Sequence, residues 1–458
     1  MNERSIQLGN EKISKLLLRM SLPATIGMIV NALYNVVDTI FIGRGVGTLA
    51  IGGLSIAFPI QMIIMAFAQM VGIGAASAIS RSLGAGEIEK ADHVAGNSFG
   101  AILLISSIVM AVGLFFTDPL LRLFGATDAI LPYARDYIRI ILMGSVFFSF
   151  TVSANNLVRA EGSAKVSMIA MLIGTGLNII LDPIFIFTLD MGIRGAALAT
   201  IISQFCSFIY ITRYLYSDQS ILKVRWHHLK PDFKILKEIV TVGLASFARQ
   251  VAGSFVAILV NHSLAFYGGN LAISIFGVIR RVTMFLFMPL FGVVQGLQPI
   301  VGFNYGAKKY GRVKEAVKLA ILTTTIFASV SVLMGEIFPY AIFNIFSTDA
   351  ELISQGAPAL RLVILMIPVI GVQIVGAALF QSLGKALPSL VLSLLRQVLL
   401  LIPLLLFLPR IGSLGLTGIW ISYPIADLFS TILTGTLIFG ELKKMKDCEE
   451  ALPESSCV

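Results

Sequence analysis

Charged residues are scarce in this sequence. Aspartate, glutamate, lysine and arginine make up 13% of its 458 residues, whereas soluble domains carry about 25%. Three long stretches (45–80, 140–158 and 284–305) contain no charged residue, so they lack the polar face that a helix needs at a surface in contact with water. This shortage excludes a soluble globular protein.

Cysteines and clustered acids are also in short supply. The cysteines, Cys206, Cys448 and Cys457, have neither a disulfide pattern nor paired metal-ligand spacing. The sequence has no Asp-Asp-x-x-Asp cluster to hold a metal diphosphate, as a membrane-embedded prenyltransferase would need, and no loop typical of a channel filter. We therefore predict that the protein is not an enzyme and needs no cofactor. A membrane enzyme or a channel is kept only as an alternative.

Apolar residues make up 57% of the chain and fall in long blocks. About 20 such residues cross a bilayer as a helix. The blocks predict an all-α integral membrane protein with twelve transmembrane helices. These are expected near residues 17–42, 48–79, 95–117, 131–158, 164–188, 193–215, 236–266, 270–303, 316–338, 356–383, 386–408 and 415–440.

The net charge of +9 does not indicate nucleic-acid binding, because most basic residues sit in short loops between the apolar blocks. Most of these loops lie on the side that holds both ends of the chain. Short loops rich in lysine and arginine stay in the cytoplasm. The pattern therefore predicts a multi-pass protein of the cell (plasma or inner) membrane, in contact with lipid, with both termini cytoplasmic and no nucleic-acid partner.

The two halves of the chain resemble each other at a shift of about 222 residues. Arg81-Ser-Leu-Gly84 then aligns with a segment ending in Asn304-Tyr-Gly306, and Gly192-Ile-Arg-Gly195 aligns with Gly415-Leu-Thr-Gly418. Such duplication predicts two six-helix lobes related by a pseudo-two-fold axis along the membrane normal, an arrangement typical of secondary transporters. The expected divisions are a first lobe (1–215), a cytoplasmic linker (216–235), a second lobe (236–442) and a cytoplasmic tail (443–458).

Several polar side chains fall at similar depth within the first lobe. Asp38 lies near the outer end of its helix, and Asn178 and Asp182, four residues apart, share one helix face in the outer half of theirs. Tyr137 and Thr200 reach the same level on two further helices. Carboxylates can take up a proton, and oxygen ligands suit a small hard cation such as Na⁺. The residues therefore predict an ion-coupling site, with a purely structural hydrogen-bond network as the alternative.

Other polar or special residues are candidates for substrate binding or movement. Pro23, in the same helix as Asp38, either permits a kink that acts as a hinge or only starts the helix. In the second lobe, Asp427 is expected to pair with some of the arginines placed inside the membrane, and an unpaired arginine would bind an anionic or carbonyl-bearing substrate. The residues predicted to line the substrate cavity are Tyr137, Asn155, Arg281 and Asp427.

The sequence resembles the multidrug and toxic compound extrusion (MATE) family of cation-coupled antiporters, from about residue 15 to 440. The resemblance rests on the duplicated halves together with the segments Leu33-Tyr-Asn-Val-Val-Asp38, Arg159-Ala-Glu-Gly162, Asn178-Ile-Ile-Leu-Asp182-Pro and Gly195-Ala-Ala-Leu-Ala-Thr200. It is similar to the branch named after DNA-damage-inducible protein F, which keeps its essential carboxylate in the first span. The resemblance implies an H⁺ or Na⁺ site formed by Asp38, Asn178, Asp182 and Thr200, with Tyr137 and Asn155 nearby.

These observations and the resemblance predict a cation-coupled multidrug efflux antiporter. It would export small amphipathic organic compounds by alternating access, driven by H⁺ or Na⁺, and we expect it to be a monomer. The alternative is a flippase for lipid-linked precursors from a related superfamily with similar lobes.

Overall fold

The computed structural model describes residues 3–412 and 414–450, and the regular structure within these residues is helical. The first half contains α1 (Glu3–Asn10), α2 (Ile13–Gly45), α3 (Thr48–Ala85), α4 (Ile88–Phe115), α5 (Thr117–Leu123), α6 (Leu131–Ala160), α7 (Ala164–Pro183), η1 (Ile184–Thr188), α8 (Gly192–Leu215) and η2 (Trp226–Leu229). The second half contains α9 (Phe233–Gly306), α10 (Tyr310–Ile337), α11 (Pro339–Phe346), α12 (Ala350–Ile364), α13 (Ile367–Ser382), α14 (Ala386–Leu394), η3 (Leu395–Leu401), α15 (Ile402–Phe407), η4 (Leu408–Arg410) and α16 (Gly415–Glu450).

Among the described residues, ten helices are long and apolar enough to cross a bilayer, or eleven if α12 and α13, bent by 45° at their junction, form one span. The 74 residues of α9 are interrupted at Gly269, whose φ of 61° is not helical. At about 1.5 Å per residue α9 is about 110 Å long, far more than one bilayer crossing of about 30 Å. If α9 is counted as two crossings, the total would be twelve, the number predicted from the sequence.

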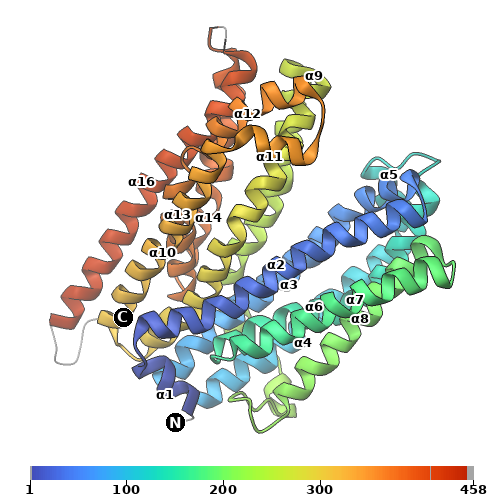
Figure 1. The fold of residues 1–458 in the computed structure, drawn as a ribbon. Helices are drawn as coiled ribbons and strands as arrows, with labels where there is room; N and C mark the ends of the chain where they lie inside the picture. Colours follow the sequence, from blue (N-terminus) through green and yellow to red (C-terminus); the bar gives the residue numbers. More distant parts are fainter. Residues whose placement is uncertain (1–2, 413, 451–458) are drawn as a thin grey trace.

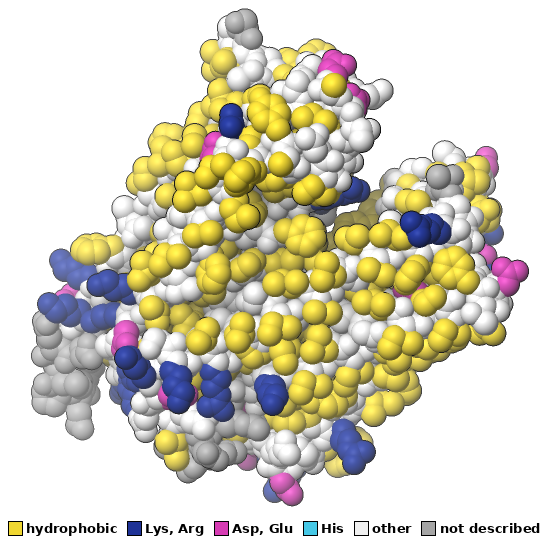
Figure 2. Space-filling model, in the orientation of Figure 1, with side chains coloured by type: hydrophobic (Ala, Val, Ile, Leu, Met, Phe, Trp, Pro, Cys, Tyr) yellow, Lys and Arg dark blue, Asp and Glu magenta, His cyan; other side chains and the backbone are white. Residues whose placement is uncertain are grey.

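The helices form two arms that meet at one end and diverge at the other (Figure 1). One arm holds α2 to α8 and the other holds the helices from α9 onward, so the structure has the two lobes that the repeat predicts. We call the end where the arms meet, beside α1, the closed end, and the opposite end the open end. In Figure 2 hydrophobic side chains cover the middle of the viewed face, and many lysines and arginines gather at the closed end.

Glycines bring the backbones of α3 and α9 into contact at the closed end. A Cβ atom placed on Gly84 would lie 1.9 Å from the carbonyl oxygen of Phe303, and one on Gly306 would lie 2.0 Å from the carbonyl oxygen of Arg81. Gly84 and Gly306 correspond to each other in the repeat. Close approach of two membrane helices requires such small residues, so these contacts join the lobes symmetrically.

We expect the Gly84→Ala variant to be less stable than the wild-type protein by roughly 1–3 kcal/mol, because the added methyl group must push the two backbones apart. The measurement is thermal unfolding of the purified protein in detergent. Gly176→Ala in α7 is the matched control, since a Cβ atom there meets nothing within 4 Å. Equal melting temperatures for the two variants would contradict the proposed contact.

The segment between α8 and α9 is bonded to the first lobe. Asp92 on α4 accepts a hydrogen bond from the backbone amide of Lys223 (2.7 Å), and Glu161, after α6, accepts one from the amide of Ile221 (2.8 Å). Asn97 donates to the carbonyl oxygens of His228, within η2, and Lys230, and it accepts a hydrogen bond from the backbone amide of Asp232. Burial raises the pKa of the Glu161 carboxyl, although its hydrogen bonds oppose the rise. The connecting segment is thus packed as part of the first lobe.

Candidate ion and substrate site

Two buried carboxyl groups face each other in the first lobe. Asp38 on α2 is 6% exposed and Asp182 on α7 is fully buried, and their carboxyl groups lie within hydrogen-bonding reach of each other. Oδ1 of Asp38 and Oδ2 of Asp182 have no hydrogen-bond donor among the described residues. Carboxylates have only acceptor atoms and repel each other, so a shared proton or a bound cation would stabilise this pair.

Asn178 and Thr200 complete the polar cluster around Asp182. The Asn178 side-chain amide donates to Asp182 Oδ1 (3.1 Å) and lies 3.3 Å from Thr200 Oγ1, while the Thr200 hydroxyl donates to the carbonyl oxygen of Ala196. Asn178 Oδ1 is buried and has no donor among the described residues. The structure therefore brings together all four residues predicted for the ion site, and their free oxygens suit a proton or a hard cation.

The cluster opens into a first-lobe cavity of about 360 Å³. Tyr137 and Asn155, both predicted to line a cavity, line this one from α6. They are 18 positions apart, which is about 27 Å along a helix, so Asn155 lies far from the acid pair, towards the closed end. Tyr34, Phe58, Gln61 and Met62 also line this cavity.

Several polar residues of this cavity were not predicted from the sequence, and two of them lie close to the predicted site residues. Tyr34 on α2 lies one helical turn before Asp38 and within hydrogen-bonding reach of Thr200. Gln61 on α3 donates a hydrogen bond to the Tyr137 hydroxyl (3.2 Å). The four-residue spacing of Tyr34 and Asp38 was a usable signal, because it places both side chains on one helix face. Gln61 gave no such signal, because the residues four positions before and after it are apolar.

The second lobe contains a buried ion pair between α16 and η3. The Arg396 guanidinium bonds to the carboxylate of Asp427, which is fully buried. Gln373 donates to the main-chain carbonyl of Asp427 (2.7 Å). Arg396 is presented by a π-helical segment, a local widening often found where a side chain must be aimed at a site. Asp427 pairs with an arginine as predicted, but it lies behind Arg396 and does not itself line the cavity.

A second cavity, of about 330 Å³, lies in the second lobe in front of Arg396. Arg280 lines it, whereas the predicted Arg281 does not and is exposed next to it. The prediction is corrected by one position, because neighbouring residues of a helix point about 100° apart. Among the described residues Arg280 has no acidic partner. Phe58 and Met62 of α3 line both cavities, so the two adjoin.

Pro23 lies inside α2, ten residues after the helix begins at Ile13. The proline therefore does not mark the start of the helix, which was one of its two possible roles. A proline in a helix removes one backbone hydrogen bond and weakens the helix locally. The missing bond lies about four turns from Asp38.

The chain belongs to the MatE family of membrane transporters. The family model matches it twice, over residues 23–184 and 245–407, and the two matches start 222 residues apart, which agrees with the repeat seen in the sequence. The protein is accordingly a multi-pass membrane transporter and not an enzyme.

Among named proteins it is similar to the multidrug export protein MepA of Staphylococcus aureus (strain MSSA476), with 27% identity over 93% of this chain and 94% of MepA. It is also similar to two solved structures, and each match covers 98% of this chain and 100% of the solved chain. One is the outward-facing conformation of a multidrug resistance MATE family transporter (TM-score 0.92, 29% identity). The other is a MATE structure in the bent conformation (TM-score 0.93, 28% identity).

Proposed function

We propose that this protein exports amphipathic organic compounds from the cell in exchange for H⁺ or Na⁺. The observation that carries the proposal is the buried pair of Asp38 and Asp182, whose free oxygens would be stabilised by a proton or cation and which adjoins a cavity large enough for an organic molecule. The similarity to proteins named multidrug export proteins supports the substrate class. The proposed substrates are small molecules, and we propose that the transporter works as a monomer.

The closed end is proposed to face the cytoplasm. Basic side chains gather there, including Arg81, Lys309 and Lys385, each of which contacts a group of the other lobe or of a neighbouring helix. Short loops rich in lysine and arginine stay on the cytoplasmic side. With this orientation both termini are cytoplasmic, and the arms diverge towards the outside. The structure then represents an outward-open state, ready to release substrate and to take up an ion.

In the proposed cycle, ion binding changes which arrangement of the lobes is favoured. A proton or Na⁺ entering from outside neutralises the pair formed by Asp38 and Asp182, and release of that ion to the cytoplasm resets the transporter. Exchange requires that both ion and substrate bind the two arrangements with unequal affinity. One charge crossing a potential of about 100 mV supplies about 2.3 kcal/mol, so a single ion provides a useful driving force. Pro23 is proposed as the point where α2 bends.

The adjoining cavities are proposed to hold the substrate between the lobes. Phe58 and Met62, shared by both cavities, offer an adaptable apolar surface. On the second-lobe side, Arg280 and the partly exposed Arg396 offer donors for a carbonyl or anionic group of the substrate. An amphipathic molecule with an apolar body and such a group would contact both sides at once.

The proposal is tested by efflux of a fluorescent amphipathic dye from proteoliposomes under a pH gradient and, separately, under a Na⁺ gradient. We expect dye movement under at least one gradient, together with counterflow of the ion. Matched proteoliposomes without a gradient are the control, and there the dye should only equilibrate. Ion flux without dye exchange would indicate a channel, and dye movement that is indifferent to both gradients would contradict ion coupling.

A flippase for lipid-linked precursors is the second candidate, because Arg280 and Arg396 would also suit a diphosphate group. The same proteoliposomes, loaded with a fluorescent lipid-linked diphosphate, distinguish the two functions. Movement of this lipid between leaflets, without movement of the dye, would favour the flippase.

A further inference from the structure

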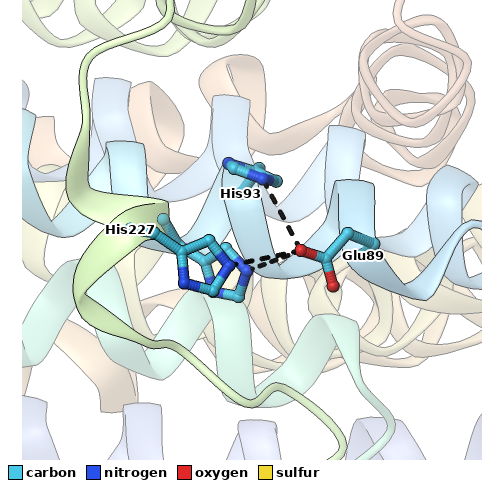
Figure 3. Close-up of side chains that lie close together, drawn as sticks. Glu89, His93 and His227 are labelled. Carbon is cyan, nitrogen blue, oxygen red and sulfur yellow. Dashed lines mark hydrogen bonds and ion pairs between the residues drawn. The ribbon is translucent and has the colours of Figure 1, made fainter.

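Three histidines and one glutamate converge at the closed end, far from the ion and substrate site. Glu89 and His93 belong to the first turns of α4, and His227 and His228 belong to η2 in the segment between the lobes (Figure 3). The Nε2 atoms of His228, His227 and His93 lie 2.9, 3.4 and 3.7 Å from the same oxygen, Oε1 of Glu89. The potential ligand atoms of all four residues lie within 4.8 Å of one another.

This donor set is that of a transition-metal site. Imidazole nitrogens with a carboxylate oxygen are ligands typical of Zn²⁺, which prefers four ligands in tetrahedral geometry. Metal–ligand bonds of about 2.0–2.1 Å place the ligand atoms of such a site about 3.3 Å apart. The cluster therefore needs to contract by only an ångström or so, about the reach of a side-chain rotation at exposed residues. His93 and His227 are 36% and 51% exposed, which leaves access for an ion.

His228 has a different role from the other two histidines. Its Nδ1 atom accepts a hydrogen bond from the backbone amide of Arg225 (3.0 Å), so the proton of the neutral ring is on Nε2. Nε2 then donates to Glu89 and cannot at the same time bind a metal. The side chain of His228 is buried, at only 2% exposed. Its hydrogen bond orients the Glu89 carboxylate, as outer hydrogen-bond partners commonly orient a metal ligand.

We propose that Glu89, His93 and His227 bind one Zn²⁺-class divalent transition metal, with a water molecule as the fourth ligand and His228 positioning Glu89. The ligands come from α4 of the first lobe and from the segment that leads into the second lobe. A bound metal would therefore add a cross-link between these two parts, beside the hydrogen bonds of Asn97. This site is independent of the proposed transport function, because none of its residues lines either cavity.

The test is metal binding by the purified full-length protein without a polyhistidine tag. Titration with Co²⁺ is followed by visible absorption, and Zn²⁺ is then added as a competitor with a chelating indicator to measure its affinity. We expect one equivalent to bind with the absorption of tetrahedral Co²⁺, and Zn²⁺ to displace it. His93→Ala and His227→Ala should each weaken binding by roughly tenfold or more.

His262→Ala is the matched control, because His262 on α9 is the remaining histidine of the chain and lies outside the cluster. It should bind the metal as the wild-type protein does. Circular dichroism and size-exclusion chromatography check that the variants are folded. Wild-type binding no tighter than that of a His93→Ala, His227→Ala double variant would overturn the proposal and leave the cluster as a proton-sharing ion pair.

A second readout reports on the cross-link itself. Trypsin cleaves after lysine and arginine unless proline follows, and Lys223 and Arg225 are exposed just before η2. Zn²⁺ should slow cleavage at these two residues in the wild-type protein and in His262→Ala, but not in His93→Ala. Equal protection in all three proteins would show that the metal acts elsewhere and would contradict the site.

Discussion

Exchange of Asp38 for asparagine is expected to abolish ion-coupled export while the protein still reaches the membrane in normal amount. The asparagine keeps the size of the side chain but cannot exchange a proton or carry the negative charge that attracts a cation. Asp182 would then face a neutral amide, and ion binding would no longer distinguish the two arrangements of the lobes. The measurement is dye efflux from cells that express the variant, with protein amount checked by immunoblot.

Asp128→Asn is the matched control for this prediction. Asp128 belongs to the same lobe, but its side chain is 87% exposed and pairs with Arg122 at the surface. Loss of such an exposed pair costs little, so the control should export dye at the wild-type rate. Wild-type efflux by Asp38→Asn would remove the coupling site from the proposed mechanism.

Replacement of Asp427 by alanine is expected to lower the stability of the protein by about 1–3 kcal/mol, because it leaves the guanidinium of Arg396, whose side chain is only 25% exposed, without its counter-charge. Asp427 is fully buried, and both oxygens of its carboxylate accept hydrogen bonds from Arg396. The measurement is thermal unfolding of the purified protein in detergent. Substrate transport should also fall, since Arg396 would lose its fixed position beside the second-lobe cavity.

Two variants separate the loss of this buried charge from the loss of an ion pair in general. The double variant Arg396→Met, Asp427→Leu removes both charges and should be close to wild-type stability, because well-packed apolar side chains replace a buried ion pair at little cost. Asp118→Ala breaks the half-exposed pair with Arg135 and should cost no more than about 1 kcal/mol. A double variant as unstable as Asp427→Ala would contradict the role given to the charge.

The spans and the two-lobe repeat were predictable from the sequence, because both depend on long-range composition that an error of a few residues does not change. The interruption of α9 at Gly269 falls in the gap between two predicted spans, 236–266 and 270–303. A prediction of which side chain faces a cavity does not tolerate such an error. An error of one residue turns a helix by about 100°, which is why the sequence pointed to Arg281 where the structure has Arg280 in the cavity lining.

The candidate ion site was predictable because its acids are rare. Few carboxylates fall inside the apolar blocks, so Asp38 and Asp182 could be singled out without knowledge of the fold. Tyr34 and Gln61 were missed because neutral polar residues are common in membrane helices, and only the packing of α2, α3 and α6 shows that these two reach the cluster. The ion that is coupled, the substrate and the branch of the family stay predictions.

In the proposed cycle, the hydrogen bonds between the connecting segment and the first lobe would set the point about which the two arms rotate. Asn97 of α4 accepts a hydrogen bond from the backbone amide of Asp232, the N-cap residue of α9, so the foot of α9 is anchored to the opposite arm. From there to Gly269 the helix runs for about 54 Å. Over this length, a rotation of α9 by about ten degrees about its N-terminal end would move Gly269 by about 9 Å. In the proposed cycle, a small rotation at this anchored end would therefore open or close the gap between the arms.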